Sequence, residues 1–97
     1  MILHTVNKSS DCLVRCLSMT SEGDAILLIE DGVYAAMNNS RNEALWHDDH
    51  AGITRYALES DLAARGISDK MLPGIEVINW QQFVSLATTC DKVVSWG

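Results

Sequence analysis

Two of the three cysteines in the sequence, Cys12 and Cys16, lie four residues apart. On a helix this spacing places both side chains on one face, with their Cβ atoms about 5–6 Å apart, whereas a disulfide needs about 3.5–4.5 Å. We therefore expect free thiols. A thiol near a helix can carry a persulfide where its thiolate is favoured. The spacing by itself favours the alternative, two small apolar side chains that pack a core.

Two further residues with reactive side chains lie near the ends of the chain. Cys90 precedes Asp91, so we expect an exposed thiol whose thiolate is disfavoured by the neighbouring acid. His4 lies in an apolar segment and could transfer protons, although a lone histidine in a strand is more often a hydrogen-bonded structural residue. Neither residue defines an active site by its sequence context.

Two adjacent acids, Glu30 and Asp31, are candidates for acid–base chemistry. Consecutive strand residues point to opposite faces, so we do not expect the two carboxylates to act as a pair. We expect Gly32 to supply a turn and the acids to cap the helix that follows. The run HDDH at residues 47–50 fits no zinc template with thiol partners nearby, so it is interpreted as a polar loop and no metal site is predicted.

A sheet must position these residues, and its clearest strand is the apolar run at residues 25–29. This run has no polar face, so it must be covered on both sides, as in a parallel sheet flanked by helices. Glu30 and Asp31 follow the carboxyl end of this strand, at the edge where open α/β sheets usually place functional residues. Further strands are predicted at residues 1–6, 53–58, 75–78 and 93–96. Helices are predicted at residues 11–20, 33–37, 40–46, 61–65 and 80–87.

Strands and helices thus alternate along the chain, which predicts an α/β fold. We expect a three-layer α/β/α sandwich around a largely parallel sheet of four to five strands with right-handed crossovers. Ser40 with Glu43 and Asn79 with Gln82 have capping-box spacing, and Gly66 lies where a left-handed C-cap belongs. In the last helix the apolar residues recur at i, i+3, i+4 and i+7, which predicts one apolar face: Trp80, Phe83, Val84 and Ala87.

Composition limits the possible functions. The 97 residues carry a net charge of −6 and are 47% hydrophobic, which predicts one domain, residues 1–97, with one core. The excess of acids argues against direct nucleic-acid binding, because that affinity comes from lysine and arginine. There is no apolar run of the roughly 18–20 residues that a membrane helix requires, and no signal-peptide pattern, so we expect a cytoplasmic protein with protein partners. An odd number of cysteines agrees with a reducing compartment.

Five stretches spread over the chain carry a pattern typical of one family. They are residues 3–9 (LHTVNKS), 21–24 (SEGD), 28–36 (LIEDGVYAA), 56–66 (YALESDLAARG) and 83–96. Through these stretches the sequence resembles the TusB/DsrH family of sulfur-relay proteins over nearly its whole length. The resemblance implies a DsrEFH-like fold and no cofactor.

The resemblance also implies partners. Members of this family are the small subunits of a heterohexamer built from two copies each of three related chains, so the expected partners are TusC/DsrF-like and TusD/DsrE-like chains. In the TusBCD branch, the complex passes persulfide sulfur from an upstream carrier toward 2-thiolation of the tRNA wobble uridine. In the DsrEFH branch, it relays sulfur in dissimilatory sulfur metabolism. Because the principal persulfide cysteine belongs to the DsrE/TusD-like chain, the resemblance implies an accessory subunit here.

Cys16 keeps both branches open. It precedes the Thr20 turn by four residues, at a position where DsrH-type chains carry a cysteine that TusB-type chains can lack. If the match holds, Cys16 carries sulfur itself, whereas Cys12 has no such counterpart and is interpreted as packing.

Subunit contacts are expected after the central strand, at Val33, Tyr34 and Met37. The sequence contains three tryptophans, a high number for a small domain: Trp46, Trp80 and Trp96. We expect one or more of them at a subunit interface, with core packing as the alternative. The isolated chain is expected to cover its interface by self-association, at least as a homodimer. An alternative of another class is a stand-alone small-molecule enzyme that uses His4 with Glu30 or Asp31.

Overall fold

A computed structural model describes residues 1–8, 11–46 and 52–97. Within these residues the chain forms a five-stranded sheet in the order β4-β3-β2-β1-β5, and every neighbouring pair of strands is parallel. The strands are β1 (Ile2–Val6), β2 (Ala25–Leu28), β3 (Thr54–Leu58), β4 (Glu76–Ile78) and β5 (Lys92–Trp96). The predicted parallel α/β sheet is confirmed.

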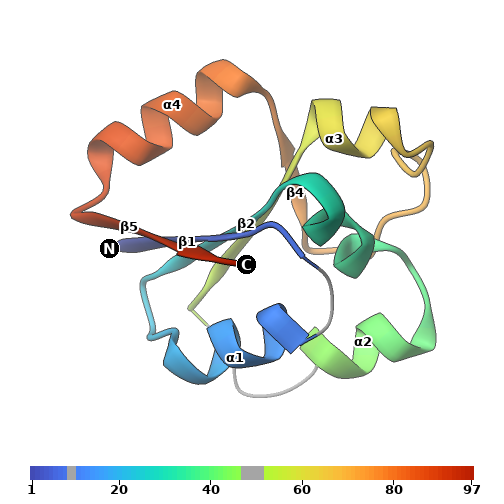
Figure 1. The fold of residues 1–97 in the computed structure, drawn as a ribbon, viewed down its shortest axis with the longest axis horizontal. Helices are drawn as coiled ribbons and strands as arrows, with labels where there is room; N and C mark the ends of the chain where they lie inside the picture. Colours follow the sequence, from blue (N-terminus) through green and yellow to red (C-terminus); the bar gives the residue numbers. More distant parts are fainter. Residues whose placement is uncertain (9–10, 47–51) are drawn as a thin grey trace.

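Helices cover both faces of this sheet and its carboxyl edge. They are α1 (Asp11–Met19), the 3-10 helix η1 (Glu30–Ala36), α2 (Ser40–Trp46), α3 (Glu59–Ala64) and α4 (Trp80–Thr89). Figure 1 shows α4 on one side of the sheet and α1 with α2 on the other, while η1 and α3 lie where β2 and β3 end. The three predicted layers are therefore present, but one outer layer contains α4 alone in this view. Among the described residues, no helix is long and apolar enough to cross a membrane.

The sheet separates two apolar clusters of unequal size. Strand β2 is buried along its whole length, as its lack of a polar face predicted. Ile26 and Leu28 belong to the larger cluster, which also holds buried residues of α1, η1 and α2. Ala25 and Leu27 belong to the smaller cluster, against which α4 packs. Because α4 contributes no fully buried residue, its side of the sheet is thinly covered.

The turn after β2 differs from the prediction. Glu30, rather than Gly32, adopts the left-handed conformation, with φ of +51°, and its backbone N–H donates to Asp61 Oδ2 at 2.7 Å. Gly32 serves a different purpose, because a Cβ there would lie 2.0 Å from the Val6 carbonyl oxygen. Neither acid caps η1 through its side chain. The close approach of η1 to β1 was invisible in the sequence because it joins distant segments.

Helix ends were predicted with mixed success. The capping box at α4 is confirmed, since Asn79 and Gln82 exchange both hydrogen bonds, at 2.8 and 2.9 Å. Helix α2 has no such box at Ser40, which is its first helical residue. Instead, Asn39 Oδ1 accepts from the Asn42 N–H at 2.8 Å. Asparagine and serine are about equally good N-caps, so the sequence alone could not decide between adjacent candidates.

The apolar stripe predicted on α4 is split in the structure. Phe83, Leu86 and Ala87 pack against the smaller cluster, whereas the side chains of Trp80 and Val84 are each 58% exposed. The side of α4 that faces the sheet is thus centred on Phe83, Leu86 and Ala87, and Trp80 and Val84 lie beside it. The predicted apolar face is present, but its Trp80 and Val84 side lies in solvent, in line with the expectation that one or more of the tryptophans lie at a subunit interface.

Candidate functional site

His4 is held in a buried hydrogen-bond network that joins β1, β2 and β5. Its Nε2 lies 3.3 Å from Asp24 Oδ2, and the Trp96 Nε1–H donates to its Nδ1 at 3.1 Å. With Nδ1 accepting, the ring proton is on Nε2 and is donated to Asp24. Both ring nitrogens are therefore occupied by side chains of the same chain, and His4 has the role of a structural histidine.

Asp24 is the acceptor at the centre of this network. Burial alone would raise the pKa of its carboxyl group, but hydrogen bonds from the N–H groups of Ile2 and Ser21 and from His4 outweigh that effect and lower the pKa. The carboxylate therefore stays ionised and fastens the start of β2 to β1. This network is a fold-stabilising feature rather than a catalytic dyad.

The two acids after β2 lie in a separate, exposed region. Asp31 accepts a hydrogen bond from Arg65 Nη2 at 2.9 Å, and the Arg65 guanidinium stacks over the Tyr34 ring at 5.9 Å. The stand-alone enzyme hypothesis needed a pocket that joins His4 to Glu30 or Asp31. Two pockets in the described part of the chain, one beside Trp46 and one beside Tyr56, are not lined by any of these residues.

Cys16 lies on the sheet-facing side of α1 with no exposed surface. Its Sγ is 3.7 Å from Thr20 Oγ1. Burial raises the pKa of the Cys16 thiol to about 11, although the Thr20 hydrogen bond opposes this effect. At pH 7 only about one such thiol in ten thousand is ionised. In this conformation Cys16 is a protonated core residue.

The other two cysteines are also free thiols. Cys12 is buried, as expected for packing, and its Sγ accepts a hydrogen bond from Arg15 Nη2 at 3.4 Å. Cys90 was expected to be exposed but is half-buried, because it is the C-cap residue of α4 and packs against the smaller cluster. The Cys90 thiol donates to the Ala87 carbonyl oxygen at 3.2 Å.

The expected contact residues after β2 are not equally accessible. Val33 is buried in the larger cluster, and Met37 is partly buried against it. Tyr34 is the exposed one of the three, at 40%. Val33 can therefore support this surface from beneath but cannot itself meet a partner in this conformation.

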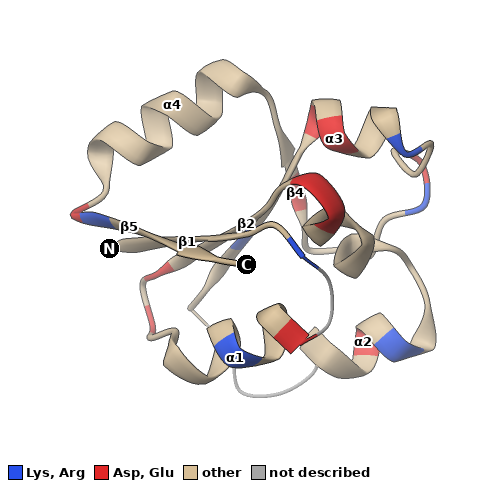
Figure 2. Ribbon diagram, viewed as in Figure 1, with Lys and Arg blue, Asp and Glu red and all other residues tan. Residues whose placement is uncertain are grey.

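A more prominent apolar surface lies on α4, of which the sequence had indicated only Trp80 as a candidate for a subunit interface. We call it the α4 face: Trp80, Val84 and the partly buried Phe83, whose ring centroid lies 5.4 Å from that of Trp80. Helix α4 contains no Asp, Glu, Lys or Arg, and its ribbon is tan throughout in Figure 2. The uncharged run WQQFVSLATT was the signal that could have identified it. Of the other tryptophans, Trp46 is buried and Trp96 is partly buried.

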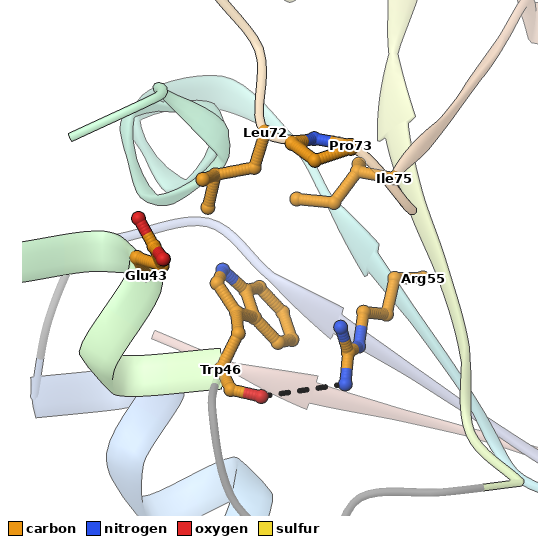
Figure 3. A pocket seen from close by; sticks show the side chains of 6 residues that line it. All are labelled: Glu43, Trp46, Arg55, Leu72, Pro73 and Ile75. Atoms are coloured by element: carbon orange, nitrogen blue, oxygen red, sulfur yellow. Dashed lines mark hydrogen bonds between the residues drawn. The ribbon is translucent and has the colours of Figure 1, made fainter. Parts of the chain in front are cut away.

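A pocket that we call the Trp46–Arg55 pocket lies between α2, β3 and the segment before β4 (Figure 3). Its volume is about 340 Å³, and its lining residues are Glu43, Trp46, Arg55, Leu72, Pro73 and Ile75. This pocket could not be predicted from the sequence, because its walls come from three separate segments of the chain. The HDDH run at residues 47–50 lies outside the described residues. Within the described ranges no three His, Cys, Asp or Glu side chains gather as a metal site.

Solved structures with the same architecture define the fold class. The YchN protein of Escherichia coli matches with a TM-score of 0.73 and 14% identity, with 97% of each chain covered. A protein of unknown function from Methanobacterium thermoautotrophicum, MTH1491, matches with a TM-score of 0.75 and 15% identity, with 97% of this chain and 96% of that chain covered. At these identities the likeness shows the fold alone.

Sequence comparison identifies the family within that fold. The family model described as DsrH like protein matches residues 8–93. Protein TusB of Shigella flexneri is 37% identical, and Protein TusB of Escherichia coli K12 is 36% identical. Each alignment covers 98% of this chain and 100% of the relative. The chain belongs to the DsrH-like family, and the resemblance to the TusB/DsrH sulfur-relay proteins is confirmed.

Proposed function

We propose that this chain is a non-catalytic subunit of a cytoplasmic sulfur-relay complex that passes persulfide sulfur toward 2-thiolation of the tRNA wobble uridine. Its partners are TusC/DsrF-like and TusD/DsrE-like chains in a heterohexamer. The observation that carries the assembly role is the α4 face. The family membership supports a role in the sulfur-relay pathway. The burial and protonation of Cys16 support a subunit that does not itself carry sulfur.

The α4 face has the character of a protein contact. Exposed tryptophan and valine keep apolar surface in water, at a cost of about 25 cal/mol for each Å², and tryptophan is typical of the residues that dominate binding energy at interfaces. The chain has 13 acidic residues, yet none lies on α4. A face without charge can be buried against a partner without desolvating an unpaired ion.

Cys16 supports an accessory rather than a sulfur-carrying role. A thiol attacks a persulfide donor as the thiolate, and Cys16 is both fully buried and held protonated. In the proposed complex, the partner chain carries the persulfide while this subunit completes the assembly.

The alternative is a DsrEFH-type relay in sulfur oxidation with Cys16 as the persulfide carrier. The cysteine at position 16 keeps this alternative open, because DsrH-type chains carry a cysteine at that position. It requires α1 to move so that the thiol reaches solvent and loses its proton.

Co-expression with the two homologous chains of the same organism tests the proposal. Native mass spectrometry is expected to show one complex that contains this chain, and deletion of the chain is expected to lower 2-thiouridine in tRNA. A chain that never joins its homologues would overturn the assembly role, and unchanged thiolation after deletion would overturn the pathway. A gain of one sulfur on this chain that Cys16→Ser abolishes and Cys90→Ser preserves would establish the alternative.

A further inference from the structure

The Trp46–Arg55 pocket has no part in the proposed relay, yet its walls combine features that select a ligand. Trp46, Leu72, Pro73 and Ile75 form apolar walls, and charged groups lie at two sides. Its volume of about 340 Å³ is at the lower end of the roughly 300–1,000 Å³ typical of small-molecule sites. We propose that it binds a small organic monoanion, a single carboxylate on a flat apolar body.

Arg55 is the group that would hold the carboxylate. A guanidinium has five N–H donors, and within the described residues Arg55 uses one of them, from Nη2 to the Trp46 carbonyl oxygen at a long 3.4 Å. Its Nε is buried and has no hydrogen-bond partner among the described residues. A buried donor left unpaired costs about 1–3 kcal/mol, so the apo pocket carries a cost that an acceptor could remove.

Arg55 differs from Arg65 in its partners. Arg65 lies 2.9 Å from Asp31 and 3.7 Å from Asp61. No carboxylate of the described residues forms an ion pair with Arg55, although the chain has 13 acids and a net charge of −6. An arginine beside an apolar pocket that no described carboxylate pairs with suits a carboxylate supplied by a ligand, which it can bind with two parallel hydrogen bonds.

Trp46 supplies the flat surface and fixes the position of the guanidinium. The Arg55 guanidinium carbon lies 5.2 Å from the Trp46 ring centroid, within cation–π range. The indole itself is anchored, because its Nε1–H donates to the Ala35 carbonyl oxygen at 2.9 Å. Figure 3 shows Leu72 and Ile75 facing the indole across the pocket. A planar apolar body can therefore lie between the indole and these side chains.

Glu43 restricts the charge of the ligand. Figure 3 places it on the opposite side of the indole from Arg55. A carboxylate there repels a second negative charge, so a dianion such as a phosphate monoester, with its charge of about −1.5 to −2, is disfavoured. One guanidinium facing one carboxylate selects an anion with a single charge at one end.

Binding of phenylacetate, with phenylacetamide as the neutral probe of the same shape, tests this inference. Titration is followed by ¹H–¹⁵N NMR at the Trp46 indole N–H and the Arg55 Nε–H. We expect millimolar phenylacetate to shift both signals and to bind about tenfold more tightly than the amide, since hydrogen bonds to charged groups are the stronger class. No shift at the Trp46 indole, or equal affinity for the two probes, would overturn the site.

Two charge-removing variants should act in opposite directions. Arg55→Gln is expected to abolish the preference for phenylacetate, and Glu43→Gln is expected to raise phenylacetate affinity about two- to fivefold, by removing a partly screened repulsion. Arg15→Gln, on α1, is the matched control and should leave both affinities unchanged. If Arg55→Gln loses its dispersed spectrum, the Glu43→Gln arm decides, and an unchanged or weaker affinity there would contradict the proposed charge selection. Failure of the site would leave the assembly proposal standing, because that proposal rests on the α4 face.

Discussion

At the scale of single residues, the surroundings decide which reactive side chains can react. His4 and Cys16 both have the types that chemistry needs, but one has both ring nitrogens engaged and the other has no exposed surface. From the sequence, the structural reading of His4 and the packing reading of Cys12 were already favoured. The partners Asp24 and Trp96 could not be foreseen, because they lie on neighbouring strands far apart in sequence.

The Asp24 network predicts a specific pH dependence of stability. The folded-state pKa of Asp24 lies below its ordinary value of 3.8, so its stabilisation is present above that value and is lost as pH falls through the folded pKa. We expect Asp24→Asn to cost about 1–3 kcal/mol at pH 7 through weakened hydrogen bonds. Urea unfolding from pH 7 to pH 2 should show a smaller loss of stability for the variant than for the wild type.

Asp91 is a second carboxyl group that can make stability depend on pH, because its hydrogen bond to the amino terminus also lowers its pKa. Asp91→Asn, at an exposed site, measures that contribution separately from the contribution of the buried Asp24. If Asp24→Asn leaves the slope of stability against pH unchanged between pH 5 and pH 2, the role given to the buried carboxylate is wrong.

The state of the cysteines predicts an order of labelling. Iodoacetamide should modify the half-buried Cys90 first and leave Cys16 unmodified in the folded chain, because alkylation needs an accessible thiolate. Peptide mass mapping at successive times, with a urea-unfolded sample as the control, measures this order. Labelling of Cys16 as fast as Cys90 in the native protein would contradict the buried state and strengthen the carrier alternative.

At the scale of elements, periodicity predicted the strands and helices well, whereas the ends of the helices were predicted only in part: the capping box of α4 and the left-handed Gly66 are confirmed. The apolar run at residues 25–29 and the 3.6-residue period of α1 each reflect burial by the whole sheet, so one sequence suffices to see them. The cap of α2 and the turn at Glu30 depend on one hydrogen bond or one close approach. The split stripe of α4 depends on how much sheet remains uncovered, which no local pattern records.

The corrected cap of α2 can be tested by a pair of neighbouring substitutions. Asn39→Ala should cost about 1 kcal/mol, because it removes the acceptor of the Asn42 N–H. Ser40→Ala, one residue later, should change stability by less than about 0.5 kcal/mol. Chemical denaturation of both variants measures the difference. A larger cost at Ser40 would restore the capping box that the sequence predicted.

At the scale of the whole molecule, the chain combines a large core on one side of the sheet with a thin layer on the other. The side bearing α4 has the smaller cluster and the uncharged α4 face. The family resemblance predicted partners, and it also predicted contacts after β2, where Tyr34 is exposed. The sequence indicated Trp80 only as one of three tryptophans that could lie at an interface, because Trp80 and Val84 fit a buried stripe equally well. We propose that the isolated chain self-associates through this face, which avoids contact between like charges.

The most direct test of the central claim is the incorporation of surface variants into the complex with the two homologous chains. Trp80→Asp combined with Val84→Asp should abolish incorporation in native mass spectrometry, because both exposed apolar side chains of the α4 face become charged. Val14→Asp is the control on α1, where the side chain is 51% exposed, and it should assemble like the wild type. Circular dichroism must show that all variants stay folded. Assembly of the folded double variant at wild-type levels would contradict the account.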